Sequence, residues 1–258
     1  MIKTTQDRIL AIRKNGYTLD FENVFNQAFD NYKKIALYGG LIIFVFFVLL
    51  SILAFGAVIA IFGSPAVVDF LKPENLNPQE FTLNTLLIFS GISVVISCLI
   101  SPLPAALVKM AYCAERDEEF HISTMFVYYK TPYFKEIFIA TFCVAIISSI
   151  LSAVINYTQI PAIGFVVTII IKLFTVLMIP LIIFGKLKAI EALEISILIV
   201  SKQPLVLLGL IVVGTIGTLV GLIGCCIGIF FTLPFLNSLY YAIYSEIIGF
   251  DAENENTI

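Results

Sequence analysis

The stretch that decides the fold is IALYGGLIIFVFFVLLSILAFGAVIAIFGSPAVV, residues 35–68, which contains no Asp, Glu, Lys or Arg. Residues 81–108 and 203–245 are equally free of charge, and Lys172 is the one charged residue within 137–185. A charge in the core of a bilayer costs about 2.5 to 3.5 kcal/mol or more, so uncharged runs of this length are typical of chains that have lipid as their solvent. The four blocks therefore predict an all-α, polytopic membrane helix bundle.

The composition supports the same class. Hydrophobic residues make up 60% of the chain and charged residues 13%, against about 25% charged residues in ordinary soluble domains. The net charge of -3 is small and the basic residues are scattered, so no nucleic-acid partner is indicated. The cysteines show no CxxC spacing and are predicted to be buried thiols, with a vicinal disulfide between the last two as the alternative: Cys98, Cys113, Cys143, Cys225 and Cys226.

Length divides the blocks into six spans, because about 20 helical residues cross the core of a bilayer. We predict spans at about 35–62, 83–112, 134–155, 165–184, 204–223 and 229–248. Pro102 and Pro104 interrupt the second span. The resulting organisation is an N-terminal segment (1–34), a six-helix transmembrane domain (35–248) and an acidic tail (249–258).

The basic residues predict the orientation of these spans. If the N-terminus is inside, the cytoplasmic segments are 1–34, 109–135, 185–203 and the tail, and they carry every Lys and Arg except Lys72 and Lys172. Positive charge is retained on the cytoplasmic side of membranes. Because residues 1–34 show no signal-peptide pattern, we expect a multi-pass protein with both termini in the cytoplasm.

Two amphipathic helices are predicted beside the spans. From Asp20 to Tyr32 apolar residues recur at three- and four-residue spacing, and the Asp20 side chain is positioned to cap the helix. The second helix covers residues 189–201 and carries Glu191 and Glu194. We expect both in the inner interface. The first is interpreted as a structural collar, with a lipid-sensing or partner-docking helix as the alternative.

The polar residues exclude several enzyme classes. His121 is the single histidine, so neither an HExxH zinc protease nor a histidine-rich iron site can be assembled from this chain. Ser93 lies in a GxS tripeptide within a span, but a serine protease needs a base beside it, and His121 belongs to a predicted inner loop. No GxxxxGK[ST] or GxGxxG pattern is present. We therefore expect a non-enzymatic protein that needs no metal or cofactor.

A stripe of glycines predicts close helix packing. Spacings of three and four residues place them on one helical face and create small-xxx-small pairs. The favoured interpretation is packing between the fifth and sixth spans, and a homodimer seam is the alternative. The glycines are Gly214, Gly217, Gly221, Gly224 and Gly228.

Lys172 is the anomaly within the uncharged blocks. It lies about eight residues into the predicted fourth span, and no acidic residue in the spans neutralises it. In one interpretation its ammonium donates to helix carbonyls and to Asn237, locking the fourth and sixth spans together. In the other it faces a cavity that binds an anionic group. The other polar residues assigned to this midplane site are Asn237, Ser238, Ser93 and Ser97.

The C-terminal half carries a recognisable pattern in EALEISILIVSKQPLVLLGLIVVGTIG (191–217) and CCIGIFFTLPFLNSLYYAIYSEIIGF (225–250). Ala192, Leu193 and Ser196 lead into a long span, and the last span contains Pro234 and ends in tyrosines. The pattern resembles uncharacterised bacterial six-span membrane proteins, including the membrane domain attached to some glycerophosphodiester phosphodiesterases.

A second resemblance lies at the N-terminus. DFENVFNQAFDNYKK (20–34) resembles the start of small Bacteroidetes membrane proteins that sometimes carry a carotenoid oxygenase label. That chemistry binds iron through four histidines on a β-propeller, which a helical chain with one histidine does not provide. Together the resemblances imply a module of the bacterial inner membrane without a known reaction.

We therefore expect a non-enzymatic scaffold, lipid-binding or assembly module of the inner membrane. Its expected partners are membrane lipids, with a second copy of the chain or another membrane protein as further candidates. The alternative is a transporter or permease for a small or lipid-like anion, with its site around Lys172 and Asn237.

Overall fold

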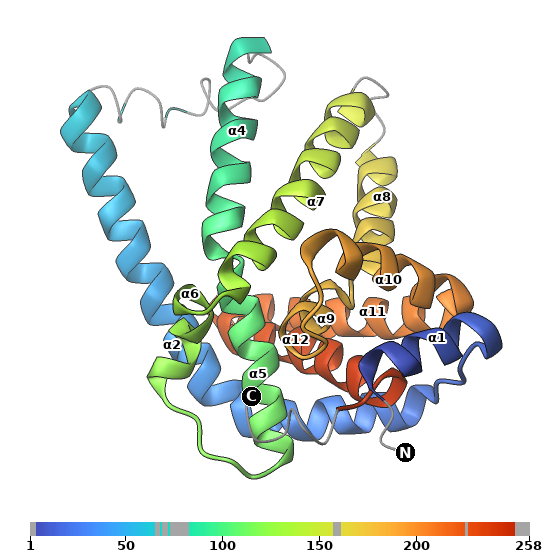
Figure 1. Cartoon of the computed structure of the whole chain (residues 1–258). Coiled ribbons are helices and arrows are strands. Elements are labelled where there is room, and N and C mark those ends of the chain that lie inside the picture. The colour runs from blue at the N-terminus through green and yellow to red at the C-terminus, as the bar shows by residue number, and fades with distance from the viewer. Residues whose placement is uncertain are drawn as a thin grey trace.

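The structure is a computed structural model that describes residues 4–64, 68, 72, 83–156, 161–224 and 227–250. Helices and short connections make up these residues, and no strand occurs among them. Figure 1 shows two regions: helical segments, here called the arms, project from one side of a compact group of helices, here called the base.

The arms are the final part of α2 (residues 48–62), α4 (Leu83–Ile100), α7 (Tyr133–Asn156) and α8 (Pro161–Phe174). The base contains the earlier part of α2, which spans Phe21–Phe62 as a whole, together with α1 (Thr5–Asn15), α5 (Pro102–Glu115), α9 (Met178–Ile183), α10 (Ala189–Lys202), α11 (Pro204–Leu219) and α12 (Gly228–Ile247). Shorter turns link them: η3 (Ile122–Phe126), α6 (Val127–Lys130) and η4 (Val220–Ile223).

Helix α2 joins the two regions without interruption. Its N-cap is Asp20, whose side chain accepts a hydrogen bond of 3.0 Å from the amide of Asn23, so the predicted helix start is confirmed. The predicted collar helix and first span are not separate, however, but form one helix of 42 residues. No Pro interrupts this stretch, and its inner face (Val24, Ala28 and Ile35) is fully buried in the base, which keeps the helix continuous.

The base is built around α2, α5 and α12. The first part of α2 packs antiparallel to α12, and the Ser238 hydroxyl donates to the Ala28 carbonyl oxygen at 2.7 Å. The two helices approach so closely that a Cβ at Gly40 would lie 2.6 Å from the Phe231 ring. Helix α5 is buried on every side, as expected for a helix without a polar face.

The second predicted span is broken where Pro102 predicts it. Helix α4 ends at Ile100 and α5 begins at Pro102, which has no amide hydrogen for the Cys98 carbonyl four residues earlier. The Ser101 hydroxyl donates to that carbonyl instead, at 2.7 Å, and the Tyr129 hydroxyl donates to the Leu99 carbonyl at 2.8 Å. Side chains thus satisfy the backbone groups that the break leaves free.

The predicted fourth span is also broken, at residues 175–177 between α8 and α9. Ser196 of α10 is fully buried against this break. Its hydroxyl donates to the Phe174 carbonyl at 2.6 Å and accepts from the Leu177 amide at 3.3 Å. One side chain from a neighbouring helix therefore serves both sides of the interruption.

Helix α1 is a second helix within residues 1–34, where the sequence analysis predicted one. Thr4 and Asp7 form a capping box, and Gly16 ends the helix with a φ of 71°. Arg8 donates to the carbonyl oxygens of Ile248 and, at 3.2 Å, of Phe250 just after α12. The Tyr17 hydroxyl donates to the Ile199 carbonyl at 3.1 Å, and burial raises the pKa of Tyr17 to about 12. These bonds fasten α1 and the following turn to the base.

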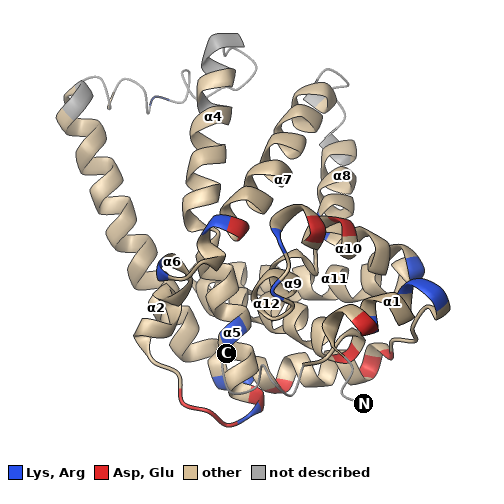
Figure 2. Cartoon of the chain, in the orientation of Figure 1, with Lys and Arg blue, Asp and Glu red and all other residues tan. Residues whose placement is uncertain are grey.

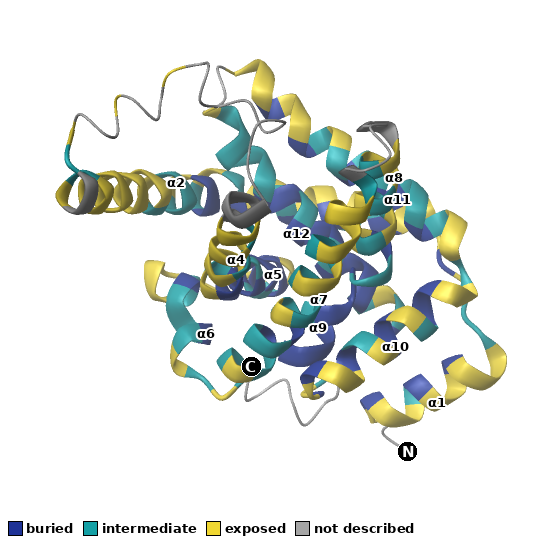
Figure 3. Cartoon of the chain, turned by 90° about the horizontal axis from the view of Figure 1, so that it is seen from above, coloured by how far each residue is buried: buried dark blue, intermediate teal, exposed yellow. Residues whose placement is uncertain are grey.

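Five helical segments of the described chain are long and apolar enough to cross a membrane. They are Phe21–Ala60, Ser90–Glu115, Tyr133–Ile155, Ile163–Ile183 and Pro204–Ile223. The chain is accordingly an all-α, multi-pass membrane protein. The predicted sixth span is not among the five, and α11 and α12 lie across the base rather than along α4, as Figures 1 and 3 both show. Six spans and their orientation therefore stay a prediction.

Candidate functional site

The arms present apolar surface that the rest of the described chain does not cover. No residue of the most apolar stretch of α2 is buried, and Leu49 and Leu53 are 56% and 71% exposed. Helix α4 packs mainly on α7 and α7 also packs on α8, whereas α2 packs on α12, α5 and α11 of the base. Figure 3 shows exposed residues along α2, α4 and α7. Apolar surface on this scale is unfavourable in water, so the arms require lipid or other protein to cover them.

Charged residues mark where the arms end. Figure 2 shows Lys, Arg, Asp and Glu on the base and at its junction with the arms, while the described parts of the arms above that junction carry none. At the junction, here called the waist, Lys135 and Glu136 lie in the first turn of α7, and Lys188, Glu191 and Glu194 lie at the start of α10. This sharp change from charged to uncharged residues is typical of the boundary between headgroups and acyl chains.

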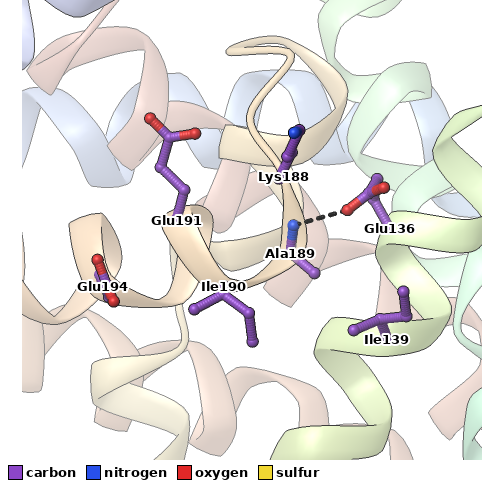
Figure 4. Close-up of a pocket in the computed structure, with 7 residues that line it drawn as sticks. All are labelled: Glu136, Ile139, Lys188, Ala189, Ile190, Glu191 and Glu194. Atoms are coloured by element: carbon purple, nitrogen blue, oxygen red, sulfur yellow. Dashed lines mark hydrogen bonds between the residues drawn. The ribbon is translucent and has the colours of Figure 1, made fainter.

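An open pocket of about 410 Å³ lies at the waist between α7 and α10. The Glu136 carboxylate accepts a hydrogen bond of 2.9 Å from the Ala189 amide, which is the first amide of α10. Figure 4 shows this bond beside the other side chains that surround the pocket. The lining combines three carboxylates, one ammonium and apolar side chains: Glu136, Ile139, Lys188, Ala189, Ile190, Glu191 and Glu194.

Lys172 lies within the apolar segment Ile163–Ile183, near the end of helix α8. Helix α8 ends at Phe174, so Lys172 lies in its last turn, next to the base, and its side chain is exposed. The break at 175–177 places this lysine close to the base, although it is still the tenth residue of the 21-residue apolar segment Ile163–Ile183. Among the described residues, no ion pair or hydrogen bond engages its ammonium.

The other residues assigned to the midplane site are not gathered around Lys172. Asn237 is buried on α12 and donates to the Leu233 carbonyl of its own helix at 3.1 Å. Helix α8 packs on α7, α10 and α11, whereas α12 packs chiefly on α2, α11 and α5. Ser238 is engaged with Ala28, and Ser93 and Ser97 are exposed on the α4 arm. The structure therefore does not bring the predicted set together.

The glycine stripe lies between α11 and α12. A Cβ at Gly214 would lie 2.7 Å from Leu239, one at Gly217 would lie 2.8 Å from the Phe235 ring, and one at Gly221 would lie 2.6 Å from the Gly228 carbonyl group. Gly224 is less crowded, with its nearest neighbour at 3.5 Å. These small residues let the two helices approach within the chain.

The described part of the chain holds no group of three or more His, Cys, Asp and Glu side chains arranged to bind a metal ion. Cys98, Cys113 and Cys143 are free thiols, and the first two are buried. Cys225 and Cys226, which carried the prediction of a vicinal disulfide, lie outside the described residues.

No family model, curated protein or solved structure matches the chain. The resemblance to bacterial six-span membrane proteins therefore stays a prediction. The observations that bear on function are the exposed arms, the charged waist and the pocket between α7 and α10.

Proposed function

We propose that the protein is a non-enzymatic scaffold of the bacterial inner membrane that holds lipid among its arms. The observation that carries this proposal is the isolation of the α2 arm: α2 packs chiefly on helices of the base, whereas the α4, α7 and α8 arms pack on one another. Its apolar faces cannot be left to water. Acyl chains that lie beside this arm would be bounded by the arm and by the base beneath it.

The charge distribution supports an orientation for this scaffold. The base contains most of the segments in which the sequence analysis located the basic residues, and Figure 2 shows these residues at one end of the arms. Under the positive-inside rule the base then faces the cytoplasm. The arms enter the membrane from that side.

Single-tryptophan variants give a direct test, because the native chain contains no Trp. Leu49→Trp, Leu50→Trp and Phe55→Trp lie on three different faces of the α2 arm, since successive helical residues are about 100° apart. In vesicles that contain brominated phospholipids, we expect strong fluorescence quenching at all three positions. The buried Phe184→Trp in the base is the control and should be quenched weakly.

The same experiment is able to contradict the proposal. If one face of the arm is protected while the other two are quenched, protein covers that face, through either α4 or a second chain. A lipid-holding scaffold should also retain phospholipid after purification in a mild detergent, at a fixed ratio to protein that native mass spectrometry measures. Protein that is folded but free of lipid would count against the proposal.

Transport of a small or lipid-like anion is the second candidate function. It is favoured by the two interrupted spans, α4 to α5 and α8 to α9, because transporters often use discontinuous helices. Anion uptake into proteoliposomes separates the two functions. Uptake that Lys172→Met abolishes would favour transport, and absence of uptake for every anion tested would favour the scaffold.

A further inference from the structure

We infer that the pocket between α7 and α10 binds the headgroup of an aminophospholipid, which combines a phosphate with a primary ammonium group. This inference rests on the proposed lipid-holding function and names the class of lipid. Its starting point is the pocket itself, whose volume of about 410 Å³ falls in the range of small-molecule sites, about 300 to 1,000 Å³.

The pocket changes from polar to apolar in the direction of the membrane. Helix α7 begins at Tyr133 and runs away from the base, so Ile139 lies one turn farther from the base than Glu136, by about 4.5 Å. In Figure 4 the side chains of Ile139 and Ile190 lie on the same side of the pocket, and the charged ends of Lys188 and Glu191 lie toward the opposite side. Ile190 is 52% exposed although it is apolar. A phospholipid has the same order of parts, with the headgroup outside and the acyl chains inside.

The charges in the pocket fit a ligand that carries both signs. The residues around the pocket carry three carboxylates and one ammonium group, so their net charge favours a cation. Glu136 already accepts from the Ala189 amide, whereas the Glu191 and Glu194 side chains are exposed. Because a primary ammonium donates up to three hydrogen bonds, the carboxylates of Glu191 and Glu194 are suited to bind it.

Lys188 supplies the opposite charge for the phosphate. It is the N-cap residue of α10, and its side chain makes no capping hydrogen bond. The next amides of that helix, at Ile190 and Glu191, belong to the first turn, where amides have no partner within the helix. A phosphate at this position would meet an ammonium together with the positive end of a 14-residue helix.

Native mass spectrometry of the full chain tests this inference. The delipidated protein is titrated with phosphatidylethanolamine, phosphatidylcholine and phosphatidylglycerol of identical acyl chains. We expect phosphatidylethanolamine to bind about tenfold more tightly than phosphatidylcholine, whose quaternary ammonium donates no hydrogen bond. The double substitution Glu191→Gln and Glu194→Gln should remove this preference, and Lys188→Gln should weaken all three lipids.

Glu22→Gln is the matched control, because Glu22 is an exposed carboxylate in the first turn of α2, outside the pocket. It should leave lipid binding unchanged. Equal binding of the three lipids, or a preference that survives the double substitution, would overturn the headgroup site while leaving the scaffold intact. A folded wild-type protein that binds none of them would overturn both proposals.

Discussion

The base and the arms are built from similarly apolar helices, but these helices are covered in different ways. In the base, α5 is surrounded by protein, and Ala105, Ala106 and Ala111 have no exposed surface. In the α2 arm, no residue of the most apolar stretch is buried. The hydropathy of a helix indicates only that its surface is unfavourable in water. Whether protein or lipid replaces the water depends on close approach between helices, which small residues and side-chain hydrogen bonds permit in the base.

Glycine substitutions provide the largest expected contrast between the two regions. A Cβ at Gly40 would meet the ring and the Cα atom of Phe231 at 2.6 and 2.8 Å, whereas a Cβ at Gly56 of the arm would meet nothing within 4 Å. Gly40→Ala should therefore destabilise the protein by about 2 to 3 kcal/mol through overpacking. Gly56→Ala should be neutral or stabilising by up to about 1 kcal/mol, because Ala favours helix.

Thermal unfolding followed by circular dichroism in detergent measures both glycine variants. The distinction between base and arms requires opposite shifts of the unfolding midpoint, or a shift in Gly40→Ala alone. Equal losses of stability would mean that the α2 arm is also packed tightly against protein.

Ser196→Ala should have the next largest effect. It leaves the Phe174 carbonyl and the Leu177 amide of the α8 to α9 break without their shared partner. The loss of a buried polar partner costs about 1 to 3 kcal/mol. Ser201→Ala on the same helix is the control, because Ser201 is exposed and bonds only to the Ile197 carbonyl of its own helix. If Ser196→Ala and Ser201→Ala have the same thermal unfolding midpoint, the break between α8 and α9 does not depend on the Ser196 hydroxyl.

Ionisation of Tyr17 at high pH is expected to lower the stability of the protein by a smaller amount. Because burial raises its pKa to about 12, the folded base favours the neutral phenol, whose hydroxyl donates to Ile199. This contribution to stability should be complete below pH 10 and should be lost as the pH rises toward 12. Difference absorbance at 295 nm between the native protein and Tyr17→Phe should isolate one group that titrates near pH 12. A group that titrates near pH 10 would show that Tyr17 is not held in the base.

Lys172→Met should have the smallest effect on stability. The Lys172 side chain is exposed in the last turn of α8, so its loss should change the unfolding free energy by less than about 0.5 kcal/mol. Loss of folding in this variant, seen as aggregation on size exclusion, would restore the interpretation that Lys172 locks two spans together.

Much of the helical framework was predictable from the sequence. The uncharged blocks predicted the apolar helices, Pro102 predicted the break after α4, and Asp20 predicted the start of α2. The helix predicted at 189–201 corresponds to α10. The start of α1 also has a signal in the sequence, because Thr4 and Asp7 have the spacing of a capping box.

The arrangement of the helices was less predictable. No residue pattern distinguishes a helix that lies across the base, such as α11, from one that projects from it. The break at 175–177 is hydrogen-bonded to Ser196 of another helix, so the sequence of the predicted fourth span alone does not indicate that α8 ends two residues after Lys172. The pocket at the waist was missed for a similar reason. Glu136 and Ala189 meet only because α7 and α10 pack together.

The pairing of α2 with α12 has a consequence for the order of events during synthesis. Ser238 and Ala28 are hydrogen-bonded although they lie 210 positions apart in the chain. The ribosome releases α2 long before α12. The inner face of α2 therefore remains unpaired while the intervening helices are synthesised. Insertion of the arms therefore precedes closure of the base. Of the described helices α12 is translated last, and a chain truncated before it would remain an inserted intermediate in which α2 has no such partner.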